Sequence, residues 1–255
     1  MTGRRLGGAL GTLGLLAAWA VLSSTVFTTA DGVPTPWAVL RQVGHDGWTF
    51  YGPHIRQTGT EALIGYLFGN ALALGCAMLV LLVPALERVV TQLAVASYCL
   101  PIVAVGPILS LVFTGSRPMD AMAGLSVFFT TLIGGLLGLR SADQSALDVV
   151  RAYGGGRWQQ LVRVRAIAAL PSTVAALKIA APAALLGAII GEYLGRVDAG
   201  LGVAMTISEQ QLEVARTWGI ALVAGALAGV AYALIGLAGR IALPWSRVTT
   251  VDGTW

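Results

Sequence analysis

Long apolar stretches separated by short polar ones constrain this chain more than any other feature. A helix that crosses a lipid bilayer needs roughly 20 apolar residues, and six stretches of the 255-residue chain reach that length: 6–28, 60–83, 89–113, 119–139, 169–194 and 216–243. Only 11% of the residues are charged and the mean hydropathy is +0.78, so polar surface is too scarce for a water-soluble domain. The sequence predicts an all-α integral membrane protein, a bundle of about six transmembrane helices forming one domain over residues 1–255.

The distribution of arginines predicts which ends of these helices face the cytoplasm. Lys and Arg are enriched in the cytoplasmic loops of membrane proteins. With the N-terminus inside, the inner segments hold ten arginines and the outer segments five. Both termini and the connection at residues 140–168 are therefore expected on the cytoplasmic side of the membrane.

One polar, arginine-rich segment, residues 141–171, lies between the fourth and fifth apolar stretches. Ser141 and Gln144 have the spacing of a capping box at a helix start. Gly154, Gly155 and Gly156 interrupt the helical periodicity, because glycine reaches the left-handed conformations that end helices. We therefore expect two short helices, broken at the glycines, with one face free to contact a partner in the cytoplasm.

Catalytic patterns are not found in the chain. A phosphate-binding P-loop needs a lysine after glycine, and the one lysine, Lys178, stands between Leu177 and Ile179. His45 and His54 both fall in the first outer connection, away from the membrane depth at which a Ser/His pair would have to work. A zinc site would need more His or Cys. We expect no enzyme activity and no cofactor in this chain, so any ATP would act on another subunit.

Binding to nucleic acid is not expected either, because no basic cluster carries interleaved aromatic residues. Polar residues in or beside the apolar stretches are instead candidates for lining a transport pathway, with ordinary hydrogen bonding between helices as the alternative. These candidates are Glu61, Asn70, Ser97, Tyr98, Ser110 and Glu192.

Prolines and glycines predict details of helix shape and packing. Pro101 and Pro107 predict a bend in the third stretch, since proline removes a backbone donor. Small residues four apart let membrane helices approach closely. Such pairs occur at Gly65/Gly69, Gly134/Gly138, Gly187/Gly191 and Gly225/Gly229.

The polar segment resembles the cytoplasmic loop of ABC importer permeases. That family's motif is Glu-Ala-Ala, three residues, Gly, and about nine residues later Ile-x-Leu-Pro. Here Asp148, Val149 and Val150 stand at the Glu-Ala-Ala positions, Gly154 at the glycine and Val164 at the isoleucine.

The copy of the motif is degenerate. Ala166 and Ile167 replace its Leu-Pro, whereas a second Leu-Pro common in one branch is kept as Leu170 and Pro171. The Arg-Trp-Gln that this branch favours after the glycine appears at residues 157–159.

Three other stretches resemble the same branch, the permeases of sulfonate, taurine and nitrate type. Residues 101–115, PIVAVGPILSLVFTG, are similar to its I-P-x-x-A-x-x-P-L-x-x-L-W-F-G segment. Residues 191–194, GEYL, followed by GLG at 200–202, are similar to its second motif. Residues 34–40, with Pro-Thr-Pro, fit its first loop.

The resemblance implies a multi-pass permease subunit of a bacterial inner-membrane importer for a small solute. Its implied partners are two copies of a cytoplasmic ABC ATPase carrying ATP and Mg²⁺, a second permease subunit that is identical or a paralogue, an extracytoplasmic substrate-binding protein and membrane lipid. The implied coupling residues are Asp148, Arg151, Tyr153, Gly154, Arg157, Trp158 and Leu161. Tyr153 and Trp158 would be apolar anchors in an ATPase groove, and Arg151 and Arg157 charged contacts.

Two other classes of protein stay open as alternatives. One is a secondary transporter or channel subunit driven by an ion gradient, which would be expected to show deeper charges or inverted repeats. The other is a scaffold subunit without transport, in which the segment 141–171 would serve for docking alone.

Overall fold

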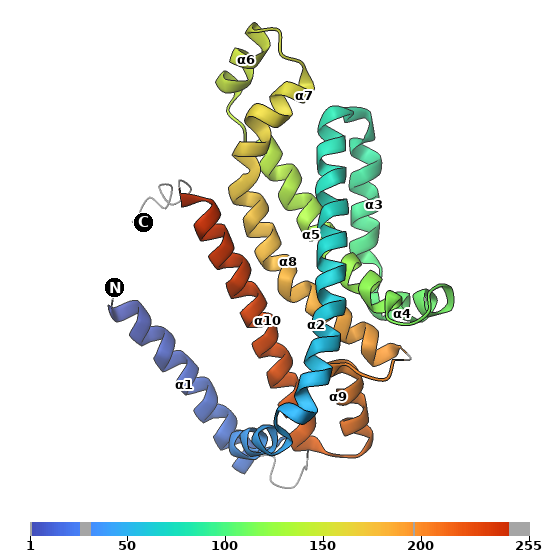
Figure 1. The fold of residues 1–255 in the computed structure, drawn as a ribbon. Helices are drawn as coiled ribbons and strands as arrows, with labels where there is room; N and C mark the ends of the chain where they lie inside the picture. Colours follow the sequence, from blue (N-terminus) through green and yellow to red (C-terminus); the bar gives the residue numbers. More distant parts are fainter. Residues whose placement is uncertain (1, 26–31, 196, 245–255) are drawn as a thin grey trace.

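The computed structural model describes residues 2–25, 32–195 and 197–244, apart from the side chains of residues 2–10 and 12. The described residues form helices joined by short connections, and no strand occurs among them. Figure 1 shows the helices: α1 (Thr2–Thr25), α2 (Pro36–Leu82), α3 (Glu87–Cys99), α4 (Ile102–Val112), α5 (Arg117–Arg140), α6 (Gln144–Ala152), α7 (Arg157–Gln160), α8 (Ala166–Leu194), α9 (Leu201–Gln210) and α10 (Val214–Ala242).

The expected all-α membrane bundle is confirmed, and the number of spans is close to the predicted six. Within the described residues, four helices are long and apolar enough to cross a membrane: α2, α5, α10 and the continuous helix Arg157–Leu194 that contains α8. The pair Pro84–Cys99 and Ile102–Val112 would make a fifth. In α1 the described apolar part is Leu13–Thr25, and residues 26–28 of the expected first span lie outside the described residues.

The expected third span, 89–113, is a broken pair of helices rather than one continuous helix. α3 and α4 meet at an angle of 100°. Leu100 is extended (φ −69°, ψ 124°), as the residue before a proline prefers, and Pro101 then starts α4 without a backbone N–H. The predicted bend is confirmed, but it is too sharp for a simple crossing.

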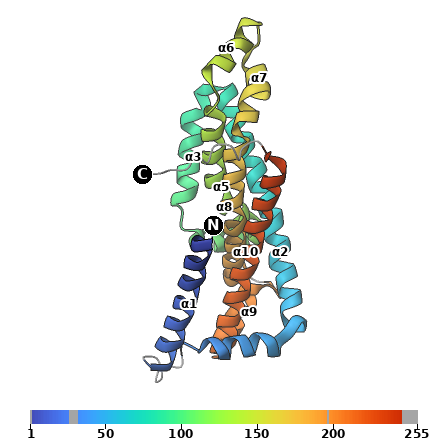
Figure 2. The same ribbon diagram turned by 90° about the vertical axis from the view of Figure 1, so that its left-hand side faces the viewer.

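The connection expected at residues 29–59 is largely helical. Thr35 caps α2 by accepting a hydrogen bond from the Ala38 N–H (3.3 Å), and Pro36 occupies the first helical position. Gly47 has φ +59° and kinks the helix. Residues 36–46 therefore form an arm that lies across the end of the bundle (Figure 2).

The core of the bundle is α5, which packs between α2 and α8. A Cβ atom added to Gly65 would lie 2.4 Å from the Ala123 Cβ, and one added to Gly69 would lie 2.4 Å from the Gly124 carbonyl oxygen. These distances show that α2 and α5 touch through their backbones, as the glycine spacing predicts.

The other three glycine pairs divide between buried and open positions. Gly134/Gly138 pack against α8, and Gly187/Gly191 pack against α5. Among the described residues, no atom lies within 4 Å of a Cβ added to Gly225 or Gly229 in α10, so these residues do not make the expected close approach.

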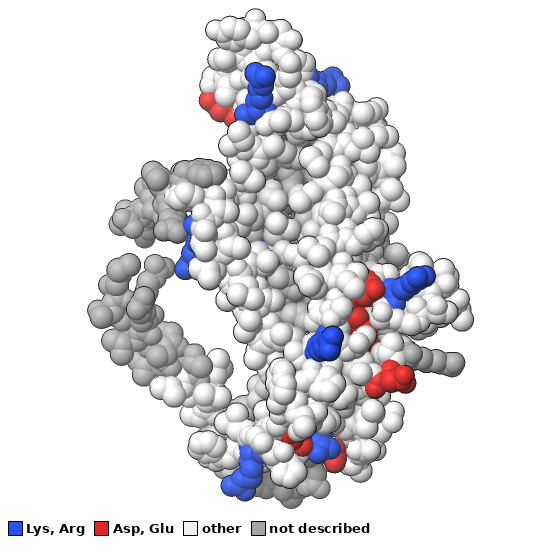
Figure 3. Space-filling view, viewed as in Figure 1, with Lys and Arg blue, Asp and Glu red and all other residues white. Residues whose placement is uncertain are grey.

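The outer surface of the bundle is apolar. Only 6% of the most apolar 18-residue stretch of α10 is buried, and large side chains such as Leu234 and Ile241 are exposed. Charged atoms gather at the end formed by α6 and α7 and again toward α4 and α9, and the surface between them is largely uncharged apart from a basic side chain near the end of α10 (Figure 3). Such a belt suits contact with lipid.

Candidate functional site: the α6–α7 loop and its link to the opposite end

The segment 141–160 projects beyond the ends of α2 and α5 (Figures 1 and 2). Its two short helices, broken at the glycines, are as the sequence predicts. Gly154 has φ +77°; its N–H donates to the Arg151 carbonyl oxygen (2.8 Å), and the Gly155 N–H donates to that of Val150 (2.8 Å). This pair of bonds is a Schellman motif, which ends α6 and reverses the chain.

The expected capping box at Ser141 is wrong. α5 continues through Arg140, so Ser141 belongs to its end, where the Ser141 hydroxyl donates to the Gly138 carbonyl oxygen (2.8 Å). Asp143 caps α6 instead, accepting from the Ser145 N–H (3.3 Å). Hydrogen bonds from the Ser145 hydroxyl and N–H lower the pKa of the exposed Asp143 carboxyl. A charged acid here also suits the positive end of the α6 dipole.

Large apolar side chains are exposed on this loop. Tyr153 is 89% exposed and Trp158 62% exposed, on either side of the glycine turn. Leu147 and Leu161 are buried, and Leu161 packs in a core cluster with Val80 and Leu139. The two aromatic residues expected as anchors thus present free surface, whereas Leu161 holds the loop to the bundle.

The expected charged contacts lie on the same loop. Arg151 pairs with Asp148 one helical turn away (Nη1–Oδ1 2.9 Å), with both side chains more than half exposed. Arg157 Nη1 donates to the Leu82 carbonyl oxygen at the end of α2 (3.3 Å). Basic groups are favourable at that negative end of a helix, so Arg157 ties the loop to α2.

A single helix joins the loop to the opposite end of the bundle. α7, the π-helical turn Leu161–Arg165 and α8 form one helix of 38 residues, Arg157–Leu194. At 1.5 Å per residue it is roughly 57 Å long. π-helical turns often occur at functional sites. One helix, with Pro171 and Pro182 in its interior, therefore joins the loop to Glu192.

Glu192, near the far end of α8, is 1% exposed and fully engaged. Its carboxylate accepts from the Thr58 hydroxyl (2.7 Å) and from the Gly202 N–H (2.7 Å). Thr58 in turn accepts from the Leu201 N–H (2.8 Å). Gly200, at φ +140°, precedes them, and a Cβ there would lie 2.3 Å from the Glu192 Cδ. Glu192 therefore holds the N-terminus of α9 against α2.

The candidate Glu61 lies beside Glu192. Thr58, which donates to Glu192, stands three residues before Glu61 on α2, and Glu61 is also 1% exposed. Gln57 Nε2 donates to Glu61 Oε1 (2.7 Å), whereas Glu61 Oε2 has no hydrogen-bond donor among the described residues. The fold thus brings together two of the six candidate pathway residues.

The other four candidates lie apart from this pair. Asn70 accepts from the Thr131 hydroxyl of α5 and is buried between helices. The hydroxyls of Ser97 and Ser110 donate to carbonyl oxygens of their own helices, α3 and α4. Tyr98 is 69% exposed and stacks on the Phe129 ring, with 4.6 Å between centroids.

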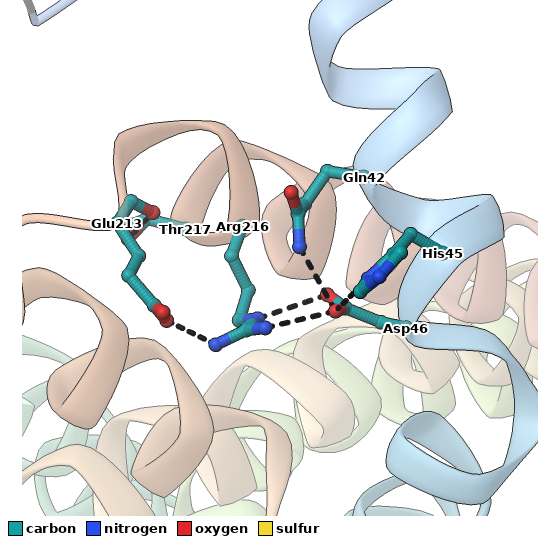
Figure 4. A network of polar contacts seen from close by, with 6 residues as sticks. All are labelled: Gln42, His45, Asp46, Glu213, Arg216 and Thr217. Atoms are coloured by element: carbon teal, nitrogen blue, oxygen red, sulfur yellow. Dashed lines mark hydrogen bonds and ion pairs between the residues drawn. The ribbon is translucent and has the colours of Figure 1, made fainter.

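A network of polar side chains that no sequence pattern indicates forms a clamp at the end of the bundle opposite to the loop (Figure 4). Arg216 donates to both oxygens of Asp46 at 2.9 Å, and Gln42 Nε2 donates to Asp46 at 2.9 Å. Glu213 also pairs with Arg216. The Asp46 side chain is 3% exposed, so this bidentate pair fixes the arm 36–46 to the start of α10.

Comparisons with known proteins agree with the geometry. Residues 65–247 match the family described as binding-protein-dependent transport system inner membrane component. A probable ABC transporter permease protein of Haemophilus influenzae is 30% identical over 182 residues, which are 71% of this chain and 74% of the relative. The formylaminopyrimidine transport permease ThiX of Halalkalibacterium halodurans is 26% identical over 84% of this chain and 86% of the relative. The riboflavin transport system permease RibX of Chloroflexus aurantiacus is 31% identical over 63% and 60%, respectively.

Proposed function

This chain belongs to the inner membrane components of binding-protein-dependent transport systems, and from that premise we propose that residues 141–171 couple it to an ATPase. It is a permease subunit of an ATP-driven ABC importer, a multi-pass membrane protein rather than a known kind of enzyme. Importers of this family work with an ATPase and a substrate-binding protein. The α6–α7 loop is the surface that receives the ATPase in our proposal.

The exposure of Tyr153 and Trp158 is the observation that carries the proposal. Both rings stand at the end of the molecule, on either side of a turn that the Schellman motif holds in place. Burial of a large apolar side chain is worth roughly 1.5–3 kcal/mol. An ATPase groove that covered both rings would therefore obtain a substantial part of its binding free energy from them. The docking surface also includes Asp148, Arg151, Gly154 and Arg157. Leu161 packs into the bundle and so holds this surface in place.

The assembly that we propose is the one that the family implies. Two ATPase subunits carry ATP and Mg²⁺ in the cytoplasm, where both termini of this chain also lie. A second permease subunit, identical or a paralogue, completes the pathway, and an extracytoplasmic binding protein delivers a small solute. Two relatives are named for formylaminopyrimidine and riboflavin transport, so aromatic heterocycles are the first ligands to test on the binding protein.

The candidate pathway residues divide by their surroundings. Tyr98 is exposed on α3 and Ser110 on α4, and Ser97 is half-buried on α3. We assign these three to the face toward the pathway and the second subunit. Glu61, Asn70 and Glu192 are buried between helices of this chain, which supports the alternative role of joining helices.

Co-purification in detergent tests the coupling surface. The double variant Tyr153→Ala with Trp158→Ala should lose its ATPase, because both anchors are gone. Trp37→Ala is the matched control, since it removes an indole that is 77% exposed on the arm at the opposite end. Unchanged ATPase recovery with the double variant would contradict the proposal, and transport driven by an ion gradient without any ATPase would favour a secondary transporter.

A further inference from the structure

A basic cavity of about 610 Å³ lies between the α6–α7 loop and the bundle. The end of α2, the turn Pro84–Leu86, the start of α3, the end of α5 and the helix that begins at α7 surround it. Four arginines and one carboxylate line it: Arg140, Arg151, Arg157, Arg165 and Glu87. Its lining therefore carries an excess of three positive charges.

The arginines are held in place, and Arg157 and Arg165 have no carboxylate partner among the described residues, whereas Arg151 pairs with Asp148. Glu87 pairs with Arg140 alone (Oε1–Nη2 2.6 Å). Arg165 Nη1 donates to the Leu139 carbonyl oxygen (3.2 Å), as Arg157 Nη1 donates to that of Leu82. A guanidinium has five N–H donors, and the described residues provide each of these two with that single acceptor. Most of their donors are therefore available to a ligand.

The position and lining of the cavity define the ligand. α2 ends at Leu82 and α5 at Arg140, so the cavity lies where the spans end and the headgroup layer begins. Val80, Leu81 and Leu161 add an apolar wall beside the arginines. Basic pockets at the cytoplasmic ends of transmembrane helices accept phosphate-bearing headgroups, and guanidinium groups match phosphate oxygens in pairs.

We propose that this cavity binds a phosphate-bearing anion, supplied either by an anionic lipid headgroup or by soluble phosphate. The anion would join Arg165 of the helix continuous with α8 to Arg140 of α5, and so brace the root of the loop. Its assignment to the cytoplasmic leaflet rests on the orientation in the proposed function, whereas the binding itself does not.

Thermal unfolding of the purified full-length chain in a neutral detergent tests the proposal without an ATPase. The probes are short-chain phosphatidylglycerol, short-chain phosphatidylcholine and inorganic phosphate. Phosphatidylglycerol should raise the unfolding midpoint in a saturable way, because a ligand that binds the folded state stabilises it. Phosphatidylcholine should give no saturable shift. A shift with inorganic phosphate as well would identify soluble phosphate as a sufficient ligand, and a shift with phosphatidylglycerol alone would identify a lipid headgroup.

Variants assign the shift to the cavity. Arg165→Gln and Arg140→Gln should each weaken the apparent affinity about fivefold, the effect of one basic group near a membrane surface. Arg163→Gln is the matched control, because this arginine is exposed, lies two residues from Arg165 and does not line the cavity. Glu87→Gln should tighten binding, since it frees Arg140.

Two results would overturn the proposal. One is that neither phosphatidylglycerol nor phosphate shifts the midpoint of the wild-type chain. The other is that Arg163→Gln weakens binding as much as Arg165→Gln, with no gain from Glu87→Gln. Because no ATPase is present in this experiment, neither result would bear on the proposed coupling function of the loop, which the co-purification experiment tests separately.

Discussion

Replacing Gly154 with valine should uncouple ATP hydrolysis from transport while leaving membrane insertion intact. Gly154 has φ +77°, and no atom of the described residues lies within 4 Å of an added Cβ. The substitution therefore meets no neighbour, and its cost comes from the backbone alone. A left-handed conformation costs an L-residue about 1–2 kcal/mol, and a β-branched residue is a stronger outlier there.

This energy is enough to change which turn the loop adopts. Since every 1.4 kcal/mol is tenfold in an equilibrium, we expect the native turn to lose roughly five- to thirtyfold in population relative to competing turns. The residual function should follow the order Gly, Asn, Ala, Val at position 154, because Asn tolerates the left-handed region better than other non-glycine residues.

Gly156 supplies the control for this series. It also has no atom within 4 Å of an added Cβ, but its backbone is extended (φ −77°, ψ −177°) and open to any residue. The measurement is substrate transported per ATP hydrolysed in proteoliposomes that contain the whole importer. Wild-type coupling in Gly154→Val, or an equal loss in Gly156→Ala, would refute the argument that the turn needs a left-handed residue.

Three further predictions concern the rest of the chain. Gly200→Ala should lower the thermal midpoint in detergent and raise amide exchange in α9, because its Cβ would collide with Glu192; unchanged exchange would contradict this. Arg216→Lys should cost about 1 kcal/mol in chemical unfolding, since lysine cannot replace the bidentate bond to Asp46, and an unaltered unfolding curve would count against the clamp. The lowered pKa of Asp143 means that its cap stabilises α6 at neutral pH and is lost as pH falls through that pKa. Amide protection in α6 should therefore fall on acidification in the wild type and stay flat in Asp143→Asn.

Features set by neighbouring residues could be predicted from the sequence. The break at Gly154 and the bend at Pro101 depend on the conformations that glycine and proline allow. The spacing of Ser141 and Gln144 predicts a cap at Ser141, but α5 extends to Arg140, and Asp143, which is also a good capping residue, caps α6 instead. The 100° angle at Pro101 also depends on packing beyond the proline itself.

Features set by distant residues could not be predicted in this way. Thr58 and Glu192 are 134 residues apart, and Asp46 and Arg216 are 170 apart. No periodicity or motif in a single sequence links such pairs. Lys178 and Tyr232 are another such pair: Nζ of Lys178 in α8 lies 4.2 Å from the centroid of the Tyr232 ring in α10.

The continuous helix Arg157–Leu194 reaches from the α6–α7 loop to the opposite end of the bundle, so a tilt of this helix would move both ends of the permease. If a helix roughly 57 Å long tilts by about 5° around its middle, each end moves by about 2.5 Å, and the two ends move in opposite directions. α5 packs along this helix. A push on Trp158 would then close one side of the membrane by the same motion that opens the other. The two gates of a transporter would need no separate signal to keep them from opening together.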